Sequence, residues 1–84
     1  MTVKFVVFGG LWFDKVNGKT YHVSKILDIQ TLTFYYTDYE YGYGNQYWKT
    51  ARDDIEKNLG YYDYMLYDMG SAYFKKSDLK RNNF

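Results

Sequence analysis

The chain has 84 residues, with eleven Lys and Arg against ten Asp and Glu, one histidine, no cysteine and twelve tyrosines. This length supports one small core rather than two, and the near balance of charge argues against strong non-specific binding to nucleic acid. Without cysteine, disulfides and thiolate zinc sites are excluded, so self-association is the extra support that we expect for a domain of this size.

A covered strand and a hairpin are predicted for the start of the chain. Residues 3–8 are β-branched or aromatic on both faces of an extended chain, which is typical of a largely buried strand. Gly9-Gly10 is expected either to end this strand or to form a bulge in it. Residues 11–13 continue the extended pattern up to Asn17-Gly18, which favours a type I′ hairpin turn, because both central residues of that turn need positive φ.

Alternating side chains predict two more strands, over residues 19–29 and 31–41, so that residues 2–43 form an antiparallel meander. On the third strand, alternate positions face opposite sides of the sheet. The set that we expect to meet a helix is Leu32, Phe34 and Tyr36. The set that we expect nearer the open face or rim is Tyr39, Tyr41 and Tyr43.

One amphipathic helix is predicted over residues 45–59, with Asn45 as its N-cap and Gly60 at its C-terminal end. Its apolar side chains repeat at helical spacing along one stripe. These side chains are Trp48, Ala51, Ile55 and Leu59. We expect this stripe to pack on one face of the sheet, because a sheet of this size must cover an apolar face.

The last part of the chain leaves two alternatives open. Residues 61–76 form either a fourth strand or an irregular aromatic segment, with a turn at residues 68–70. Residues 77–84 are expected to fray, and the lysine-rich stretch 75–81 is interpreted as a solvated tail. The predicted fold is therefore a single α+β domain over residues 1–84, in which a three- to four-stranded antiparallel sheet carries one helix on one face.

Two motifs carry a resemblance to a known group of proteins. The first is Leu11-Trp12-Phe13-Asp14-Lys15-Val16-Asn17-Gly18-Lys19-Thr20-Tyr21-His22, and the second is Tyr41-Gly42-Tyr43-Gly44-Asn45-Gln46-Tyr47 followed by Thr50-Ala51. With these motifs the chain resembles, over residues 3–60, a family of short hypothetical proteins encoded by tailed bacteriophages. The resemblance implies a hairpin followed by a Tyr-Gly-Tyr-Gly turn into a helix. It also implies a setting, that of an accessory protein inside an infected bacterium, where such products often bind and disable host proteins.

The tyrosines indicate a contact surface rather than a reaction centre. A domain this small cannot bury twelve phenols, and exposed, rigid, amphipathic rings suit binding surfaces. We therefore expect a non-enzymatic phage-type accessory protein that binds and inhibits a bacterial host protein, such as a defence component, in the host cytoplasm. The tyrosines expected to contact this partner are Tyr39, Tyr41, Tyr43, Tyr47, Tyr61, Tyr62 and Tyr64.

The chain offers few residues for catalysis or metal binding. His22 has no second histidine and no cysteine to act with, and a general base needs a pocket and a second group. We therefore expect no enzyme activity, no cofactor and no metal. Residues 1–8 are too short, before the interruption at Gly9-Gly10, for a signal peptide or a membrane span.

A second hypothesis is that the protein sequesters a nucleotide or single-stranded nucleic acid by aromatic stacking. Gly42-Tyr43-Gly44 precedes a helix N-terminus, where free N–H groups attract anions. In this alternative Tyr41, Tyr43 and Tyr47 stack a base while the amides of residues 45–47 hold phosphate. Tyr47 stands where G-x-G-x-x-G has its third glycine, so a sharp strand-to-helix turn is the competing interpretation.

Acidic side chains form a further candidate patch. They are Asp38, Glu40, Asp53, Asp54 and Glu56. They are either solvated surface groups or contacts that imitate part of a DNA phosphate array, and the near-neutral net charge argues against full mimicry. Self-association through an exposed strand edge is a third use of such a fold, and a homo-oligomer is among the expected partners.

Overall fold

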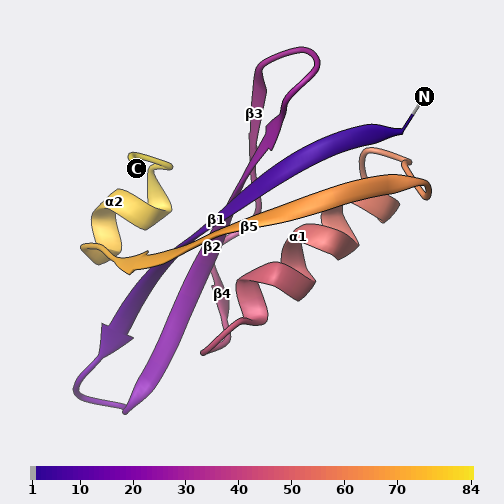
Figure 1. The fold of residues 1–84 in the computed structure, drawn as a ribbon. Helices are drawn as coiled ribbons and strands as arrows, with labels where there is room; N and C mark the ends of the chain where they lie inside the picture. The colour runs from indigo at the N-terminus through magenta and orange to yellow at the C-terminus, as the bar shows by residue number, and fades with distance from the viewer. Residues whose placement is uncertain (1) are drawn as a thin grey trace.

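The computed structural model describes residues 2–84, and the first residue of the expected 1–84 domain lies outside them. Over the described residues the α+β fold class is confirmed, with a five-stranded sheet and one main helix (Figure 1). The strands are β1 (Val3–Asp14), β2 (Lys19–Asp28), β3 (Thr33–Tyr36), β4 (Glu40–Tyr41) and β5 (Tyr64–Tyr73). The helices are α1 (Gln46–Lys57) and the short α2 (Lys76–Lys80).

The sheet is mixed, which corrects the predicted three- to four-stranded antiparallel sheet. The strand order is β3-β2-β1-β5, and β4 pairs with β2 along the same edge as β3. The pairs β1–β2 and β2–β3 are antiparallel, which gives a meander. β5 runs parallel to β1, because the chain crosses from one edge of the sheet to the other through α1, and helical crossovers join parallel strands.

The turn between β1 and β2 differs from the predicted type I′ hairpin. Asp14 pairs with Lys19, so four residues connect the strands, and within the turn only Gly18 has a positive φ, of 65°. The Asp14 carboxylate accepts hydrogen bonds from the N–H groups of Val16 and Asn17 and from the Asn17 side chain. The side-chain bond from Asn17 is the main cause that lowers the pKa of Asp14. A carboxylate therefore organises this longer turn.

β1 continues through Gly9 and Gly10, and the absence of side chains there allows α1 and α2 to pack closely on opposite faces of the sheet. A Cβ atom on Gly9 would lie 2.5 Å from Cγ of Tyr47, which packs from α1. A Cβ atom on Gly10 would lie 2.6 Å from Cδ2 of Leu79, which packs from α2. The alternative that the strand ends here is therefore wrong, and the β1–β5 pairing does shift register just before Gly9.

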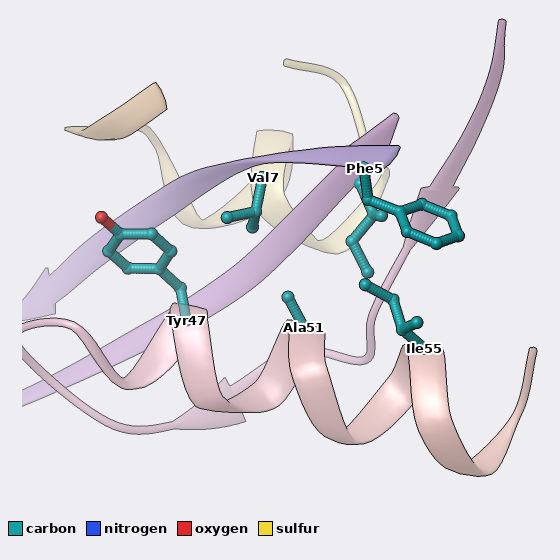
Figure 2. Close-up of a cluster of buried hydrophobic side chains, with 6 residues drawn as sticks. Phe5, Val7, Tyr47, Ala51 and Ile55 are labelled. Carbon is teal, nitrogen blue, oxygen red and sulfur yellow. The ribbon is translucent and has the colours of Figure 1, made fainter. Parts of the chain in front are cut away.

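The main core lies between α1 and one face of the sheet (Figure 2). It is formed by side chains that are at most 5% exposed: Phe5, Val7, Ile26, Tyr47, Ala51 and Ile55. Ala51 and Ile55 belong to the predicted stripe, whereas Trp48 and Leu59 are only partly buried beside the core. Tyr47 is the more buried of the two rings in the first turn, because a glycine of β1 leaves space for it.

β3 presents its side chains to the opposite faces from those predicted. Tyr35 pairs with Ile26 and packs on the α1 core. Phe34 and Tyr36 therefore lie on the face away from α1, and Leu32 precedes the strand with a φ of 57°. The expectation that these three side chains meet the helix is wrong, because pairing with β2 decides the face and a shift of one residue exchanges the faces.

β5 lies within residues 61–76 and corresponds to the strand alternative for this segment. The turn predicted at residues 68–70 is instead a bulge, where the pairing with β1 shifts register and Gly70 has a φ of 92°. Gly70 donates its N–H to the Asp68 carboxylate at 2.7 Å. One side chain thus satisfies a backbone group at the irregularity, so that the strand continues through it.

Residues 77–84 pack on the face away from α1, so the prediction that they fray is wrong. Leu79 of α2 is fully buried. The ring of Phe84 lies 6.3 Å from that of Phe8, and Lys25 Nζ donates a hydrogen bond of 2.7 Å to the backbone oxygen of Phe84. The charge of this segment suggested a solvated tail, but two apolar side chains in it contact the sheet and bury the second face in part.

Candidate functional site

Four aromatic rings form a continuous cluster on the face away from α1, near the β1–β2 turn. Trp12 pairs with Tyr21 across β1 and β2, and Tyr21 pairs with Tyr41 across β2 and β4. The ring centroids of these pairs are 6.0 and 5.9 Å apart. Tyr39, between β3 and β4, stacks on Tyr21 with centroids 5.1 Å apart and an angle of 6° between the ring planes.

Three lysines lie over these rings. Lys19 Nζ is 5.7 Å from the centroid of Tyr41, Lys76 Nζ is 5.1 Å from that of Trp12, and Lys80 Nζ is 5.2 Å from that of Tyr39. An ammonium group at this distance above a ring face is attracted by the ring quadrupole. We call this group the aromatic–lysine surface: Trp12, Tyr21, Tyr39, Tyr41, Lys19, Lys76 and Lys80.

The rings of the aromatic–lysine surface differ in their exposure to solvent. Tyr39 is half-buried, its hydroxyl is enclosed without a hydrogen-bond partner, and burial raises its pKa. Tyr41 is 57% exposed, and the neighbouring Tyr43 is 70% exposed. Tyr39 is thus held against Tyr21, whereas Tyr41 and Tyr43 leave much of their ring surface exposed.

Tyr47 is not available as a contact, which corrects its prediction as a partner-binding residue. Its ring is 5% exposed in the α1 core, and its hydroxyl donates to the Asp68 carboxylate at 2.9 Å. Burial, followed by the bond to Asp68, raises the pKa of Tyr47. The predicted stack of Tyr41, Tyr43 and Tyr47 on one base is therefore wrong.

The remaining predicted tyrosines lie at the other end of the sheet. Tyr64 pairs with Val3, nine residues before Trp12 on β1, which corresponds to roughly 30 Å at about 3.3 Å per residue. Tyr64 donates its hydroxyl to Glu56 at 2.7 Å and is half-buried. Tyr61 packs edge-on against Phe5, and Tyr62 is 79% exposed. The predicted contacts therefore form two separate groups.

Four of the five predicted acidic contacts line one groove between α1 and the segment that joins β3 to β4. They are Asp38, Glu40, Asp53 and Asp54. The groove has a volume of about 370 Å³ and is also lined by Lys49 and Lys57, so its charge is mixed. Glu56 lies outside it, bonded to Tyr64. Within residues 2–84, no three His, Asp or Glu side chains are grouped as metal ligands.

His22 is a buried link between β2 and α1. Its Nε2 lies 2.7 Å from the Thr50 hydroxyl, its Nδ1 has no hydrogen-bond partner, and the side chain is fully buried. Burial lowers the pKa of His22, while the Gly42 backbone and the Glu40 carboxylate act in the opposite direction with smaller effect. The neutral imidazole is thus the form that this site stabilises.

Stability is therefore expected to fall in mildly acidic solution. Because the folded pKa of His22 lies below the unfolded value of 6.5, the unfolded chain binds the proton first as the pH falls. The free energy of unfolding should decrease below about pH 6.5 until the folded pKa is reached. Urea unfolding at pH 7.5 and 5.5 measures this, and His22→Gln should reduce the difference. An equal difference in both proteins would show that other groups cause it.

The aromatic–lysine surface combines residues that the sequence indicated with residues that it did not. The exposure of Tyr41 and Tyr43 was expected from their alternation, but Trp12, Tyr21 and the three lysines were not candidates. The available signal was the strand register, because Trp12 and Tyr21 occupy paired positions beside the turn. No local signal places Lys76 and Lys80 over these rings.

Among the described residues, no helix has the length and apolar character needed to cross a bilayer. Comparisons with protein-family models, with curated proteins and with solved structures found no match to this chain.

Proposed function

We propose that the protein is a non-enzymatic binding module that docks on an acidic surface of a partner protein through the aromatic–lysine surface. The observation that carries this proposal is the grouping of four rings and three lysines on one surface. Aromatic residues are enriched in interface hot spots, and lysines at their rim favour a partner of opposite charge.

The distribution of charge supports an acidic partner. Lys19, Lys76 and Lys80 lie over the aromatic rings, on the face away from α1. The acidic candidates line the groove beside α1 or bond to Tyr64. An acidic partner is therefore attracted most strongly to the side that carries these three lysines, which favours one orientation at encounter.

The setting follows from the resemblance to tailed-bacteriophage proteins. In that setting the partner is a bacterial host protein in the host cytoplasm, and docking inhibits it by covering an acidic functional surface. Components of bacterial defence are the first class of partner to test.

The nucleotide alternative receives less support. The Tyr21 and Tyr39 rings are parallel and already in contact at a centroid distance of 5.1 Å, so no base fits between them. Tyr47 is in the core, and the N–H of Gln46 is bonded to the Tyr43 carbonyl at 3.2 Å. Two of the groups invoked for stacking and phosphate binding are thus already occupied.

Replacing Tyr41 and Tyr43 with alanine together is expected to remove partner binding without unfolding the domain. Both rings are exposed, and truncation of hot-spot residues costs about 2 kcal/mol or more, which corresponds to roughly thirtyfold in Kd. The tagged protein is used to capture proteins from nuclease-treated bacterial lysate, and the Kd of each captured protein is then measured with both variants.

Tyr62→Ala is the matched control, because Tyr62 is even more exposed than Tyr41 and Tyr43 but lies outside the aromatic–lysine surface. The proposal expects a partner that Tyr62→Ala retains, that the double variant loses, and that Lys19→Glu with Lys76→Glu also weakens. A partner lost only by Tyr62→Ala would move the site to the other end of the sheet. Recovery of nucleotides or nucleic acid alone would favour the stacking alternative.

A further inference from the structure

The outer edge of β5 is an open end of the sheet. β5 is the last strand on its side, and none of the strands within residues 2–84 pairs with its outer edge. Tyr67, Asp68 and Met69 are consecutive and all exposed, although neighbouring side chains of a strand face opposite sides. The middle of β5 is therefore uncovered on both faces.

This edge lacks most of the features that protect natural edge strands. Such strands are usually short, or carry lysine or proline that prevents pairing with another chain. β5 has ten residues, and none of them is Lys, Arg or Pro. Its exposed side chains include Met65, Tyr67 and Met69. The bulge at Gly70 is the one irregularity, and the chain continues as a strand on both sides of it.

Charges at the two ends of β5 indicate which strand it pairs with. Asp63 immediately precedes the strand, and Lys75 follows it closely. When two copies of β5 pair antiparallel, the acidic end of each strand lies beside the basic end of the other. Parallel pairing would bring like charges together, which is unfavourable. The two ends of β5 are thus complementary in charge to those of a second, antiparallel copy. The one charged side chain within the strand, Asp68, already accepts hydrogen bonds from the Tyr47 hydroxyl and the Gly70 N–H.

We propose that the protein forms a two-fold symmetric dimer by antiparallel pairing of the β5 edges of two copies. This pairing uses the same edge on both copies, so the dimer leaves no β5 edge free to add a third chain. The other edge of the sheet is divided between β3 and β4, with residues 37–39 outside both strands, so it offers no comparable length for further growth. The dimer joins the two sheets into one and supplies the extra support that a small core without disulfides needs.

The dimer does not depend on the function proposed above, but it has a consequence for it. A two-fold axis perpendicular to the joined sheet keeps equivalent faces on the same side. Both aromatic–lysine surfaces would then face one way, with both copies of α1 on the other side. Two linked sites on one side raise the apparent affinity for a partner that is itself dimeric or repeated.

Solution mass tests the dimer directly, by sedimentation equilibrium over a wide range of concentration. The mass is expected to rise from the 10.2 kDa of one chain to twice that value. Tyr67→Lys places a charge in the middle of the edge and should leave a folded monomer, as judged by circular dichroism. Val16→Lys adds the same charge in the exposed β1–β2 turn, away from β5, and should remain dimeric. A monomer at all concentrations in the unsubstituted protein would overturn the proposal.

Exchange of charge tests the antiparallel arrangement. Asp63→Lys alone and Lys75→Asp alone should each raise the Kd of the dimer by roughly two- to thirtyfold, because each change acts twice across the symmetry axis. The double variant should restore the original Kd. If neither single change raises the Kd of the dimer, or if the double variant has a higher Kd than either single variant, antiparallel pairing is contradicted. Growth beyond two chains would contradict a closed dimer.

Discussion

Replacing Leu79 with alanine is expected to lower the free energy of unfolding by about 2–5 kcal/mol. Leu79 is fully buried, and its Cδ2 occupies the space that a Cβ on Gly10 would fill. Removing its side chain leaves a cavity between α2 and the sheet, which the rigid strand cannot close. The loss is large for a domain of 84 residues, whose total stability is about 4–13 kcal/mol at roughly 0.05–0.15 kcal/mol per residue.

Urea unfolding followed by tryptophan fluorescence and circular dichroism measures the effect of Leu79→Ala. Ser77→Ala is the matched control, because Ser77 is exposed on the same short helix. The control should change the free energy of unfolding by no more than about 0.5 kcal/mol. If Leu79→Ala also changes it this little, then α2 does not pack on the sheet in solution. The loss of α2 would also move Lys76 and Lys80, so Leu79→Ala should weaken partner binding.

Replacing Gly9 with alanine is expected to destabilise the protein by about 1–3 kcal/mol. The added Cβ would lie 2.5, 2.6 and 2.8 Å from three atoms at the root of the Tyr47 ring, which cannot move without shifting α1. The φ of Gly9 is not positive, so the cost arises from the contact and not from the backbone. Without that contact, alanine would be favoured over glycine in a strand by roughly 0.5–1 kcal/mol. A loss of stability in Gly9→Ala would therefore indicate the close contact with Tyr47, and a gain would indicate that this contact is absent.

A double-mutant cycle identifies the cause of the Gly9→Ala effect. In a Tyr47→Leu background the ring is absent, so adding a Cβ at residue 9 should cost less than it does in the original protein. The difference between the two costs is the coupling free energy between the positions, which urea unfolding of the four proteins provides. Equal costs in both backgrounds would mean that Gly9 is needed for a reason other than close packing of Tyr47.

Local patterns were sufficient for the elements with short-range signals. The alternation of residues 19–29 and the apolar residues 3–8 correspond to β2 and part of β1, which pair as neighbours in the chain. Ala51 and Ile55, four residues apart, correctly indicate the buried stripe of α1. These predictions succeed because strand alternation and helical spacing are properties of adjacent residues, whatever the rest of the chain does.

Predictions failed where pairing or packing between distant residues decides the outcome. The parallel direction of β5 follows from the crossover through α1, and no residue within β5 encodes it. Tyr47 and Trp48 are adjacent aromatic residues at the start of α1, and the space above Gly9 selects Tyr47 for the core. The faces of β3 were reversed because its register with β2 is a tertiary choice.

The sequence by itself determined an α+β domain, a meander followed by an amphipathic helix, and an excess of tyrosines that cannot all be buried. Only the tertiary structure decided which tyrosines are exposed and which lysines accompany them. Lys76 and Lys80 lie over Trp12 and Tyr39 because Leu79, between them on α2, fits against Gly10 on a distant strand. The contact that anchors α2 joins opposite ends of the chain, and local sequence patterns carry no information about contacts of that kind.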